Sequence, residues 1–382
     1  MLNVAEYILS FFIPLIKSSE AEISTLGTVI PIPRFDPEDF LDLCRVTLTL
    51  LKKEPPLLYL EPPVFVLGDI HGDIHDLLRV LSKIFNFLSD KSAKILMLGD
   101  YIDRGGFSTE VVLLIFSLMS CYPENFFFLR GNHEFPGISS VDILDVELNS
   151  LYGKTPLFDE IHRVFSYLPL AAVIGDSYFA VHGGLSPKLI TPSDINQVEY
   201  PIVDVKADKL VEDILWSDPC AKIAGFIDST RGKGTLFGSS AIQTFLQHNN
   251  FKMIIRAHQC VINGISLFND NVITVFTTSF YNSEENKGGF LKINEAQEVL
   301  TEILVPLRTI RRQQAIFTNI SKRKTVILHP IAKSLLAAQT KSGTGRTVKP
   351  PLARPRPRGR SVKAENRNSF PVATPIIVAF PS

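Results

Sequence analysis

The sequence predicts an α/β fold in which two mixed β-sheets pack against each other between flanking helices, followed by a disordered C-terminal tail. In the first half of the chain, short apolar runs that end in glycine alternate with longer segments of helical periodicity, as in sheets that are covered by helices. The second half is richer in strand-length runs, which favours a second sheet. A chain of 382 residues with 45% hydrophobic residues has enough apolar material for such a core.

The first predicted elements are helical. The apolar stretch Ile8–Ile16 is preceded by Glu6 rather than by a basic residue, is interrupted by Pro14 and lacks a cleavage pattern after it. We therefore expect an amphipathic helix that packs on the domain, rather than a signal peptide or a membrane span. The segment Pro37–Lys52 begins with acidic residues and ends with lysine, an arrangement that suits the helix dipole.

The next elements follow the same patterns. Val64–Leu67 is an apolar run that ends in Gly-Asp, which predicts a buried strand, and Ser108 is expected to cap a helix. Further strands are expected at Ile95–Leu98, Phe126–Leu129, Leu170–Ile174, Tyr178–Val181, Phe251–Ile255, Val272–Phe276 and Gly289–Ile293. Further helices are expected at Ile74–Phe87, Ser108–Met119, Ala207–Leu215 and Ser239–His248.

Charge is divided unevenly along the chain. Lys plus Arg and Asp plus Glu each total 39, but residues 307–382 contain 16 Lys or Arg and a single acid, Glu365. The first 306 residues therefore carry a net charge of −15 and the rest +15. Because Ser342–Arg360 is rich in Gly, Pro, Lys and Arg, we predict three regions. They are an N-terminal helical leader (1–34), a main domain (35–306) and a basic, Pro-rich disordered tail (307–382).

The composition excludes several classes of protein. Collagen-like, disulfide-scaffold and wholly disordered chains do not have this composition. The four cysteines lie far apart and form no C-x-x-C pair. A reducing compartment without a disulfide framework is therefore expected.

Six polar clusters lie at the ends of apolar runs, where loops carry function in open α/β sheets. A single Gly-Asp pair is usually only a turn, but six clusters in order indicate one shared site. Asp, His and Asn supply oxygen and imidazole ligands without thiolate, a set that suits Mn, Fe or Zn rather than a structural zinc. The clusters are 68–72, 99–105, 131–134, 182–184, 231–232 and 256–259.

These clusters resemble the motifs of a known superfamily. The segments DIHG (69–72), GDYIDRG (99–105) and GNHE (131–134) are similar to the three-part motif of calcineurin-like metallophosphoesterases. HGGLSP (182–187), LWSDP (215–219), RAHQ (256–259) and the Tyr281 segment narrow the resemblance to the phosphoprotein phosphatase (PPP) family of serine/threonine phosphatases. YPENFFFLRGNHE (122–134) is most similar to the type-1 branch. The resemblance covers about residues 35–305 and implies the calcineurin-like metallophosphoesterase fold.

The resemblance also implies an activity and a cofactor. The main domain would be catalytic and would hydrolyse phosphoserine and phosphothreonine in proteins, in one step, with water activated by two divalent metal ions. Mn is the expected metal, with Fe or Zn as alternatives. Asp100 would bridge the two ions. The implied metal ligands are Asp69, His71, Asp100, Asn132, His182 and His258.

Five further residues have implied roles in the reaction. His133 would protonate the leaving oxygen, and Asp103 would orient the imidazole of His133. Arg104 and Arg231 would bind the phosphate, because a guanidinium group matches two of its oxygens. Tyr281 would lie over the same site.

The sequence departs from the family pattern at two places. The segment Phe135–Glu147, which follows GNHE, differs from the usual pattern and would border the substrate cleft. The loop Thr277–Asn282 keeps Tyr281 but lacks the family's proline, and Asn282 stands where the family has a cysteine. Covalent trapping by cyclic-peptide toxins at Asn282 is therefore expected to fail.

Two other functions remain open at this point, a nucleotide phosphohydrolase of the same superfamily and a phosphatase-fold scaffold with weakened catalysis. The expected partners are phosphoprotein substrates and regulatory or targeting subunits, with no transmembrane segment. The basic tail would contact partner domains, anionic surfaces or the acidic body of the protein. The expected location is the cytoplasm, the nucleus or both.

Overall fold

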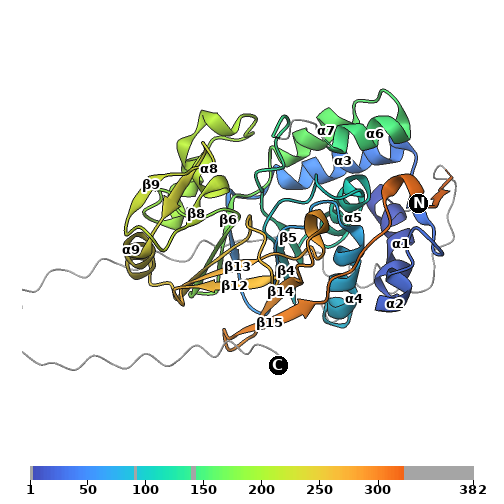
Figure 1. Cartoon of the computed structure of the whole chain (residues 1–382). Coiled ribbons are helices and arrows are strands. Elements are labelled where there is room, and N and C mark those ends of the chain that lie inside the picture. The colour runs from blue at the N-terminus through green and yellow to red at the C-terminus, as the bar shows by residue number, and fades with distance from the viewer. Residues whose placement is uncertain (1–2, 90–92, 139–142, 322–382) are drawn as a thin grey trace, which may run out of the picture.

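The computed structural model describes residues 3–89, 93–138 and 143–321. A five-stranded and a six-stranded sheet pack face to face, and helices cover both outer faces (Figure 1). This arrangement confirms the predicted two-sheet α/β architecture. In the described part of the chain, no helix is long and apolar enough to cross a membrane.

The helices and sheets have the following bounds. The helices are α1 (Val4–Ile16), α2 (Glu20–Ile23), α3 (Pro37–Leu51), α4 (Ile74–Ser89), α5 (Ser108–Cys121), α6 (Ile143–Tyr152), α7 (Leu157–Phe165), α8 (Lys209–Trp216) and α9 (Ser239–Asn249). The five-stranded sheet has the order β15 (Val299–Leu304), β14 (Gly288–Ile293), β3 (Val64–Leu67), β4 (Lys94–Met97) and β5 (Phe126–Phe128). The six-stranded sheet has the order β12 (Ile265–Phe268), β13 (Val272–Val275), β11 (Met253–Arg256), β7 (Tyr178–Val181), β6 (Ala171–Ile174) and β2 (Leu57–Leu60).

Smaller elements complete the fold. A three-stranded sheet has the order β8 (Asp218–Pro219), β10 (Thr235–Phe237) and β9 (Phe226–Asp228), and β1 (Ile32–Arg34) pairs with β16 (Phe317–Asn319). The 3₁₀ turns are η1 (Pro192–Gln197), η2 (Val205–Ala207), η3 (Tyr281–Ser283) and η4 (Arg312–Gln314).

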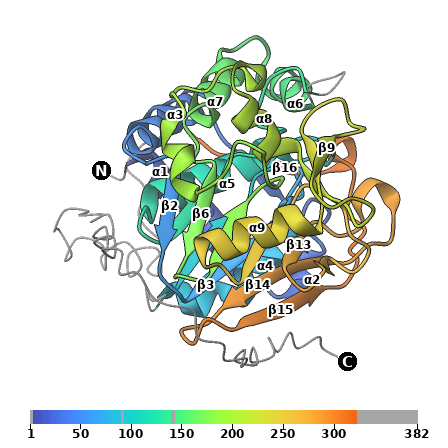
Figure 2. The ribbon, with the colours of Figure 1, turned by 90° about the vertical axis from the view of Figure 1, so that its left-hand side faces the viewer.

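The central strands of both large sheets are buried on their two faces. In β3, Val64 and Val66 belong to the cluster between the sheets, whereas Phe65 and Leu67 pack under the helices. A strand covered on both sides has no polar face, which is why β3 is a continuous apolar run in the sequence. Figure 2 shows α9 lying across the outer face of the six-stranded sheet.

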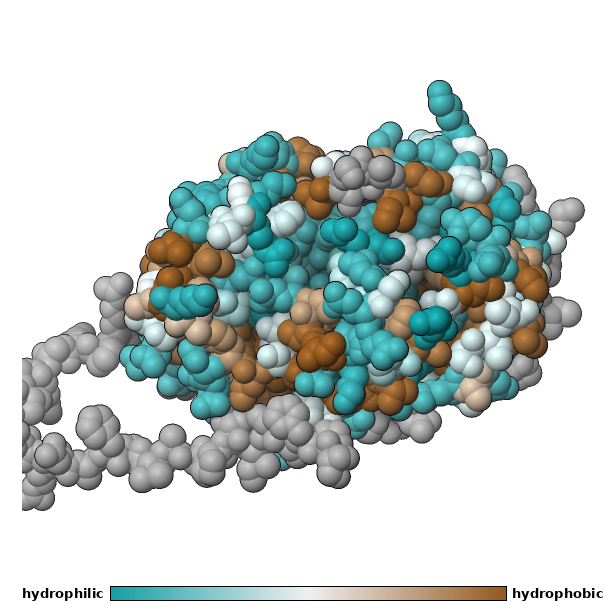
Figure 3. Space-filling model, viewed as in Figure 1, coloured by the Kyte–Doolittle hydropathy of each residue, from teal (hydrophilic) through white to brown (hydrophobic). Residues whose placement is uncertain are grey.

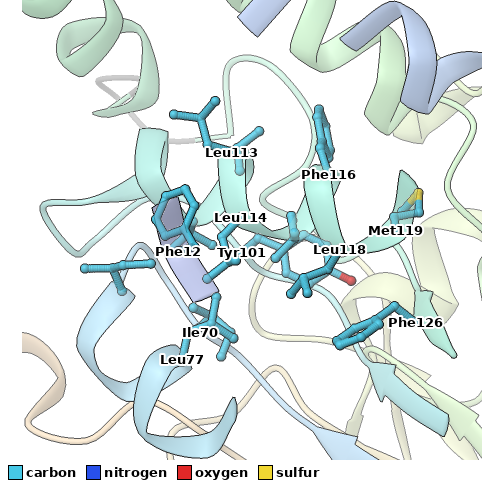
Figure 4. Packing of buried hydrophobic residues seen from close by; sticks show 14 of the residues in the cluster. Phe12, Ile70, Leu77, Tyr101, Leu113, Leu114, Phe116, Leu118, Met119 and Phe126 are labelled. Carbon is cyan, nitrogen blue, oxygen red and sulfur yellow. The ribbon is translucent and has the colours of Figure 1, made fainter. Parts of the chain in front are cut away.

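The N-terminal helix packs into the main core. Phe12 of α1 lies with Leu77 of α4 and Leu114 of α5 in the cluster that covers the five-stranded sheet (Figure 4). Asn3 and Glu6 form a capping box at the start of α1. The helix therefore begins at a clear sequence signal and buries its apolar residues on the domain.

One predicted strand belongs to a different sheet from the one that the sequence suggested, and one strand was not predicted. β14, from the second half of the chain, pairs antiparallel with β3, with Phe290 opposite Leu67. β2, which the sequence analysis did not predict, pairs parallel with β6 in the six-stranded sheet, with Leu57 opposite Ala171. An apolar pattern predicts that a segment is a strand, but it does not identify the neighbour to which the backbone binds.

The start of α5 also differs from the prediction. Ser108 is the first helical residue rather than the cap, and its Oγ accepts a hydrogen bond from the Asp103 amide at 3.2 Å. The carboxylate of Glu147 in α6 accepts hydrogen bonds from the Ser108 and Thr109 amides at 3.2 and 2.9 Å. A distant carboxylate thus satisfies the helix end that a local cap was expected to satisfy.

The C-terminal part of the described chain extends beyond residue 306. Phe317 in β16 pairs with Ile32 in β1, and Arg312 contacts Glu110 in α5 at 2.6 Å. The predicted start of the disordered tail at residue 307 is therefore too early, because this segment has long-range partners that its composition does not reveal. The rest of the predicted tail, residues 322–382, lies outside the described residues. All four cysteines are free.

Candidate metal centre

The polar clusters meet where the ends of two sheets face each other. Asp69, Asp100 and Asn132 follow β3, β4 and β5 in the first sheet, and His182 and His258 follow β7 and β11 in the second. The carboxyl ends of parallel strands lie at one sheet edge, which places such residues together. The two edges are joined directly, because the His258 amide donates to Asp69 Oδ1 at 2.9 Å.

The first group of side chains surrounds His71. Its Nε2 lies 3.6 Å from Asp69 Oδ2 and 3.7 Å from Asp100 Oδ2. Its Nδ1 lies 3.0 Å from the Ile102 carbonyl oxygen. Since that oxygen only accepts, Nδ1 carries the proton and Nε2 presents a lone pair to the two carboxylates.

The second group surrounds His182. Its Nδ1 lies 3.0 Å from the Leu98 carbonyl oxygen, while Nε2 lies 3.0 Å from Asn132 Oδ1 and 3.5 Å from Asp100 Oδ2. A donor atom of His258 also lies within 4.8 Å of donor atoms of His182 and Asp100. Asp100 thus contributes to both groups, as a bridging carboxylate does.

Two buried atoms test whether this donor set fits metal ions. Asp69 Oδ2 and His258 Nε2 are buried and form no hydrogen bond within the described part of the chain, although buried polar atoms are normally satisfied. Burial, with the nearby Asp100, raises the pKa of Asp69 to about 7. Burial lowers the pKa of His71 to about 4, so its imidazole is neutral at pH 7. Oxygen and imidazole donors that converge in this way fit two divalent ions.

His133 lies beside the first group and is held by a carboxylate. Its Nδ1 is 2.8 Å from Asp103 Oδ2, and its backbone amide donates to Asp100 Oδ1 at 2.9 Å. Burial alone would lower the pKa of His133, but the carboxylates of Asp100 and Asp103 outweigh it and raise the pKa to about 9. The imidazole is therefore protonated near neutral pH in the described surroundings.

The backbone of the site is strained at several ligand loops. Left-handed φ values occur at His71 (46°), Asp100 (54°) and His258 (68°), none of which is glycine. Such conformations are costly and persist where the surroundings enforce them, often at functional sites. Gly99 allows the close approach of two loops, because a Cβ there would lie 2.4 Å from the Gly131 amide nitrogen.

The residues predicted to contact the phosphate do not all line the same cavity. Arg104 and Tyr281 line the same cavity as His71, and the Tyr281 ring stacks on the His71 ring at 5.1 Å between centroids. Arg231 does not line that cavity in the described part of the chain. Its Nε donates to Asp218 Oδ2 at 2.6 Å instead.

Glu134 is the first of the positioning residues that the sequence analysis did not assign. Its carboxylate accepts hydrogen bonds from the amides of Asp100, Tyr101 and Gly131 at 2.8–2.9 Å. It therefore ties the loop after β4 to the loop after β5. Its position directly after His133 in GNHE was the available signal.

Arg256 and Asp218 form a second support. Arg256 is fully buried and donates to the Gly183 carbonyl at 2.6 Å and to Asp218 Oδ1 at 2.9 Å. Asp218 binds Arg231 through its other oxygen. Arg256 thus connects the loops that carry His182 and His258, and its place in RAHQ, just before that histidine, was the sequence signal.

Known proteins share this arrangement. Residues 62–261 match the calcineurin-like phosphoesterase family. The chain is 36% identical over 254 residues to the serine/threonine-protein phosphatase PP1-delta of Caenorhabditis elegans. The aligned region covers 66% of this chain and 82% of that protein.

Two solved structures extend the comparison. A Saccharomyces cerevisiae protein serine/threonine phosphatase with similarity to human phosphatase PP5 matches with a TM-score of 0.65 and 27% identity, over 72% of this chain and 91% of that one. A cold-active protein-tyrosine phosphatase of a Shewanella species shares the fold, with a TM-score of 0.52 and 22% identity over 68% and 84% of the two chains. The chain is a calcineurin-like phosphoesterase and belongs, within that group, to the phosphoprotein phosphatase (PPP) family of serine/threonine phosphatases, close to its type-1 branch.

Proposed function

We propose that this chain hydrolyses phosphoserine and phosphothreonine in proteins. The observation that carries the proposal is the convergence of two donor groups on Asp100, with the buried His133–Asp103 pair beside them. Membership of the PPP family supports the same reaction and substrate class.

The donor groups would hold the metal ions, which we propose to be Mn, with Fe or Zn as alternatives. When bound, two such ions supply Lewis-acid activation of water and neutralise charge on the phosphoryl group. Asp100 would contact both ions through its position between the groups. The other proposed ligands are Asp69, His71, Asn132, His182 and His258.

The chain's own residues would bind the phosphate and move a proton. Arg104, Tyr281 and Arg231 would bind phosphoryl oxygens, and Arg231 retains its terminal N–H groups for this while Asp218 holds its Nε. His133 would donate its Nε2 proton to the leaving serine or threonine oxygen. Because Nδ1 faces Asp103, the imidazolium is kept oriented for this transfer.

Phosphate release from a phosphothreonine peptide tests the proposal. Metal-stripped protein should be inactive and should regain turnover with Mn²⁺, whereas Asp69→Asn should bind less metal and recover little activity. His248→Asn, an exposed substitution in α9, is the matched control and should behave like wild type. A folded, metal-loaded protein that ignores phosphopeptides but cleaves nucleotides would contradict the proposal.

We further propose that regulatory or targeting subunits direct the enzyme to its phosphoprotein substrates in the cytoplasm or nucleus. The basic residues proposed to contact partners or anionic surfaces lie mostly in 322–382, outside the described residues. Affinity capture with the full chain and with a chain that ends at Ser321, followed by cell fractionation, would test both points. Equal capture and equal distribution of the two chains would remove the tail from this proposal.

A further inference from the structure

A large groove leads away from the candidate metal centre. It begins at His71, Arg104 and Tyr281, runs between α6 and the segment 308–317, and has a volume of about 980 Å³. Ligand pockets in proteins have volumes of about 300–1,000 Å³. The groove therefore has room for several residues of an extended peptide next to the metal centre. Hydrophilic side chains cover the middle of the face that Figure 3 shows.

Arginine dominates the charged lining of this groove. One of the arginines, Arg312, is already paired inside the protein, because it binds Glu110 through two contacts of 2.6 and 3.0 Å and lies 3.6 Å from Glu147. The charged residues of the lining are Arg34, Arg104, Arg308, Arg311, Arg312, Asp73 and Glu147.

The two carboxylates of the lining are turned to the protein interior. Glu147 is 4% exposed and binds the Thr109 amide and hydroxyl at 2.9 Å each. Asp73 is 12% exposed and accepts a hydrogen bond from the Asp76 amide at 2.9 Å. Neither carboxylate is presented to the open part of the groove.

Three arginines remain available to a ligand. Arg104, Arg308 and Arg311 are exposed, and within residues 3–89, 93–138 and 143–321 none of them forms an ion pair. The guanidinium group of Arg308 lies 4.9 Å from the centre of the Phe280 ring, next to Tyr281 in the chain. The groove thus carries exposed cations from the metal centre outward.

The segment that carries Arg308 and Arg311 is anchored on both sides. The Leu307 amide donates to Ser279 Oγ at 3.0 Å, and Arg312 donates to the Gly106 carbonyl at 2.9 Å. Further on, the Ile316 amide donates to the Gly27 carbonyl at 2.8 Å. Anchoring of the backbone reduces the ordering cost of binding to these side chains.

We propose that this arginine groove binds anionic side chains of the substrate. It would select phosphopeptides in which Asp, Glu or a second phosphorylated residue flanks the phosphoserine or phosphothreonine. Guanidinium groups match carboxylate and phosphate oxygens in pairs, and the cationic groove attracts acidic peptides before they dock. This inference rests on the proposed phosphatase function and names its substrate class.

Matched peptides test the inference. Phosphothreonine peptides that differ only in Glu, Gln or Lys flanks are compared, together with a Gln-flanked peptide that carries a second phosphoserine. We expect kcat/KM for the Glu-flanked peptide to exceed that for the Gln-flanked peptide about tenfold, through KM, with the ratio decreasing at high salt. A ratio near one, or a preference for Lys flanks together with no gain from the second phosphate, would overturn the inference.

Charge variants locate the effect. The double variant Arg308→Gln/Arg311→Gln should bring the Glu-to-Gln ratio close to one. Lys53→Gln/Lys252→Gln removes the same charge from exposed positions outside the groove and should leave the ratio as in wild type. An equal ratio in wild type and in the Arg308→Gln/Arg311→Gln protein would also overturn the inference.

A direct binding assay distinguishes a failure of this inference from a failure of the proposed function. If no peptide is hydrolysed, the phosphatase proposal fails, and fluorescence anisotropy with the same peptides still tests the groove. Tighter binding of the Glu-flanked or doubly phosphorylated peptide, lost in Arg308→Gln/Arg311→Gln, would support it. Equal binding of all peptides would refute it.

Discussion

His133 has its protonation state set by the residues around it. Burial lowers its pKa, but Asp100 and Asp103 raise the pKa to about 9. Asp103 contacts Nδ1 directly at 2.8 Å, which leaves Nε2 for the substrate. A histidine in this setting is an acid that keeps its proton at neutral pH.

The proposed role of His133 makes two substitutions informative. His133→Asn should lower kcat by about 10²–10⁴, the usual contribution of general acid catalysis. In Asp103→Asn the pKa of His133 should fall, because one of the charges that raise it is removed. Since the acid must be protonated, the alkaline decline of kcat/KM should then move to lower pH. A pH profile of peptide hydrolysis measures both effects, and an alkaline decline that stays at the wild-type pH would contradict the role of Asp103.

The candidate ligands and their supports differ in how far the sequence identified them. Polar clusters after apolar runs indicated a shared site, and the resemblance of GDYIDRG and GNHE to the family's motifs implied the roles of Asp100 and His133. Glu134 received no role, although it joins the two motif loops through three backbone amides. The partners of Glu134 are backbone amides, which almost every residue type has. No pattern of side chains in the sequence therefore marks these contacts. The catalytic and ligand roles themselves stay predictions.

At the level of elements, α5 depends on a residue from another helix. Phe107 precedes α5 and provides no side-chain cap, whereas Glu147 of α6 binds the first two amides. Glu147 also lies in the segment that departs from the family pattern. Glu147 also lines the arginine groove. The segment that departs from the family pattern therefore contacts the start of α5 and forms part of the groove wall.

The titration of Glu147 should be visible in the stability of the protein. Burial raises its pKa from 4.5 to about 7, an effect that exceeds the opposing effect of Arg312. Between these values the folded state binds more protons than the unfolded state, so stability falls as pH rises. Relative to Glu147→Gln, the wild-type free energy of unfolding should thus decline by about 1–3 kcal/mol from pH 4.5 to pH 7.

Urea denaturation across this pH range measures the effect. Glu124→Gln is an exposed control and should give a difference from wild type that does not change with pH. A constant difference for Glu147→Gln as well would show that Glu147 does not titrate as described.

At the scale of the whole molecule, the N-terminal and C-terminal parts of the described chain contact each other. β1 pairs with β16, the Tyr7 hydroxyl donates to the Ser321 carbonyl, and Ile310 packs near Gly27. In Figure 1 the segment after β15 runs past α4 toward the N-terminal helices. The segment therefore belongs to the folded body.

Truncation at two positions should distinguish the contribution of residues 307–321 to stability from that of residues 322–382. A chain that ends at Ser321 should unfold at the same urea concentration as the full chain. A chain that ends at Pro306 loses Arg312 and leaves Glu110 and Glu147 buried without their cation, so its free energy of unfolding should fall by about 3–5 kcal/mol. Equal stability of the two shortened chains would contradict this assignment.

Local pattern was sufficient for the two-sheet fold class, for most strands and helices and for the family, because alternation, periodicity and motif spacing are properties of neighbouring residues. It was not sufficient for the sheet that β14 joins, for the cap that Glu147 provides or for the partners of Arg312. Each of these depends on residues that are distant in the chain and meet only after the sheets and helices have packed. The arginine groove has the same origin, since Arg104 and Arg308 share one lining only because the C-terminal segment folds back across the site.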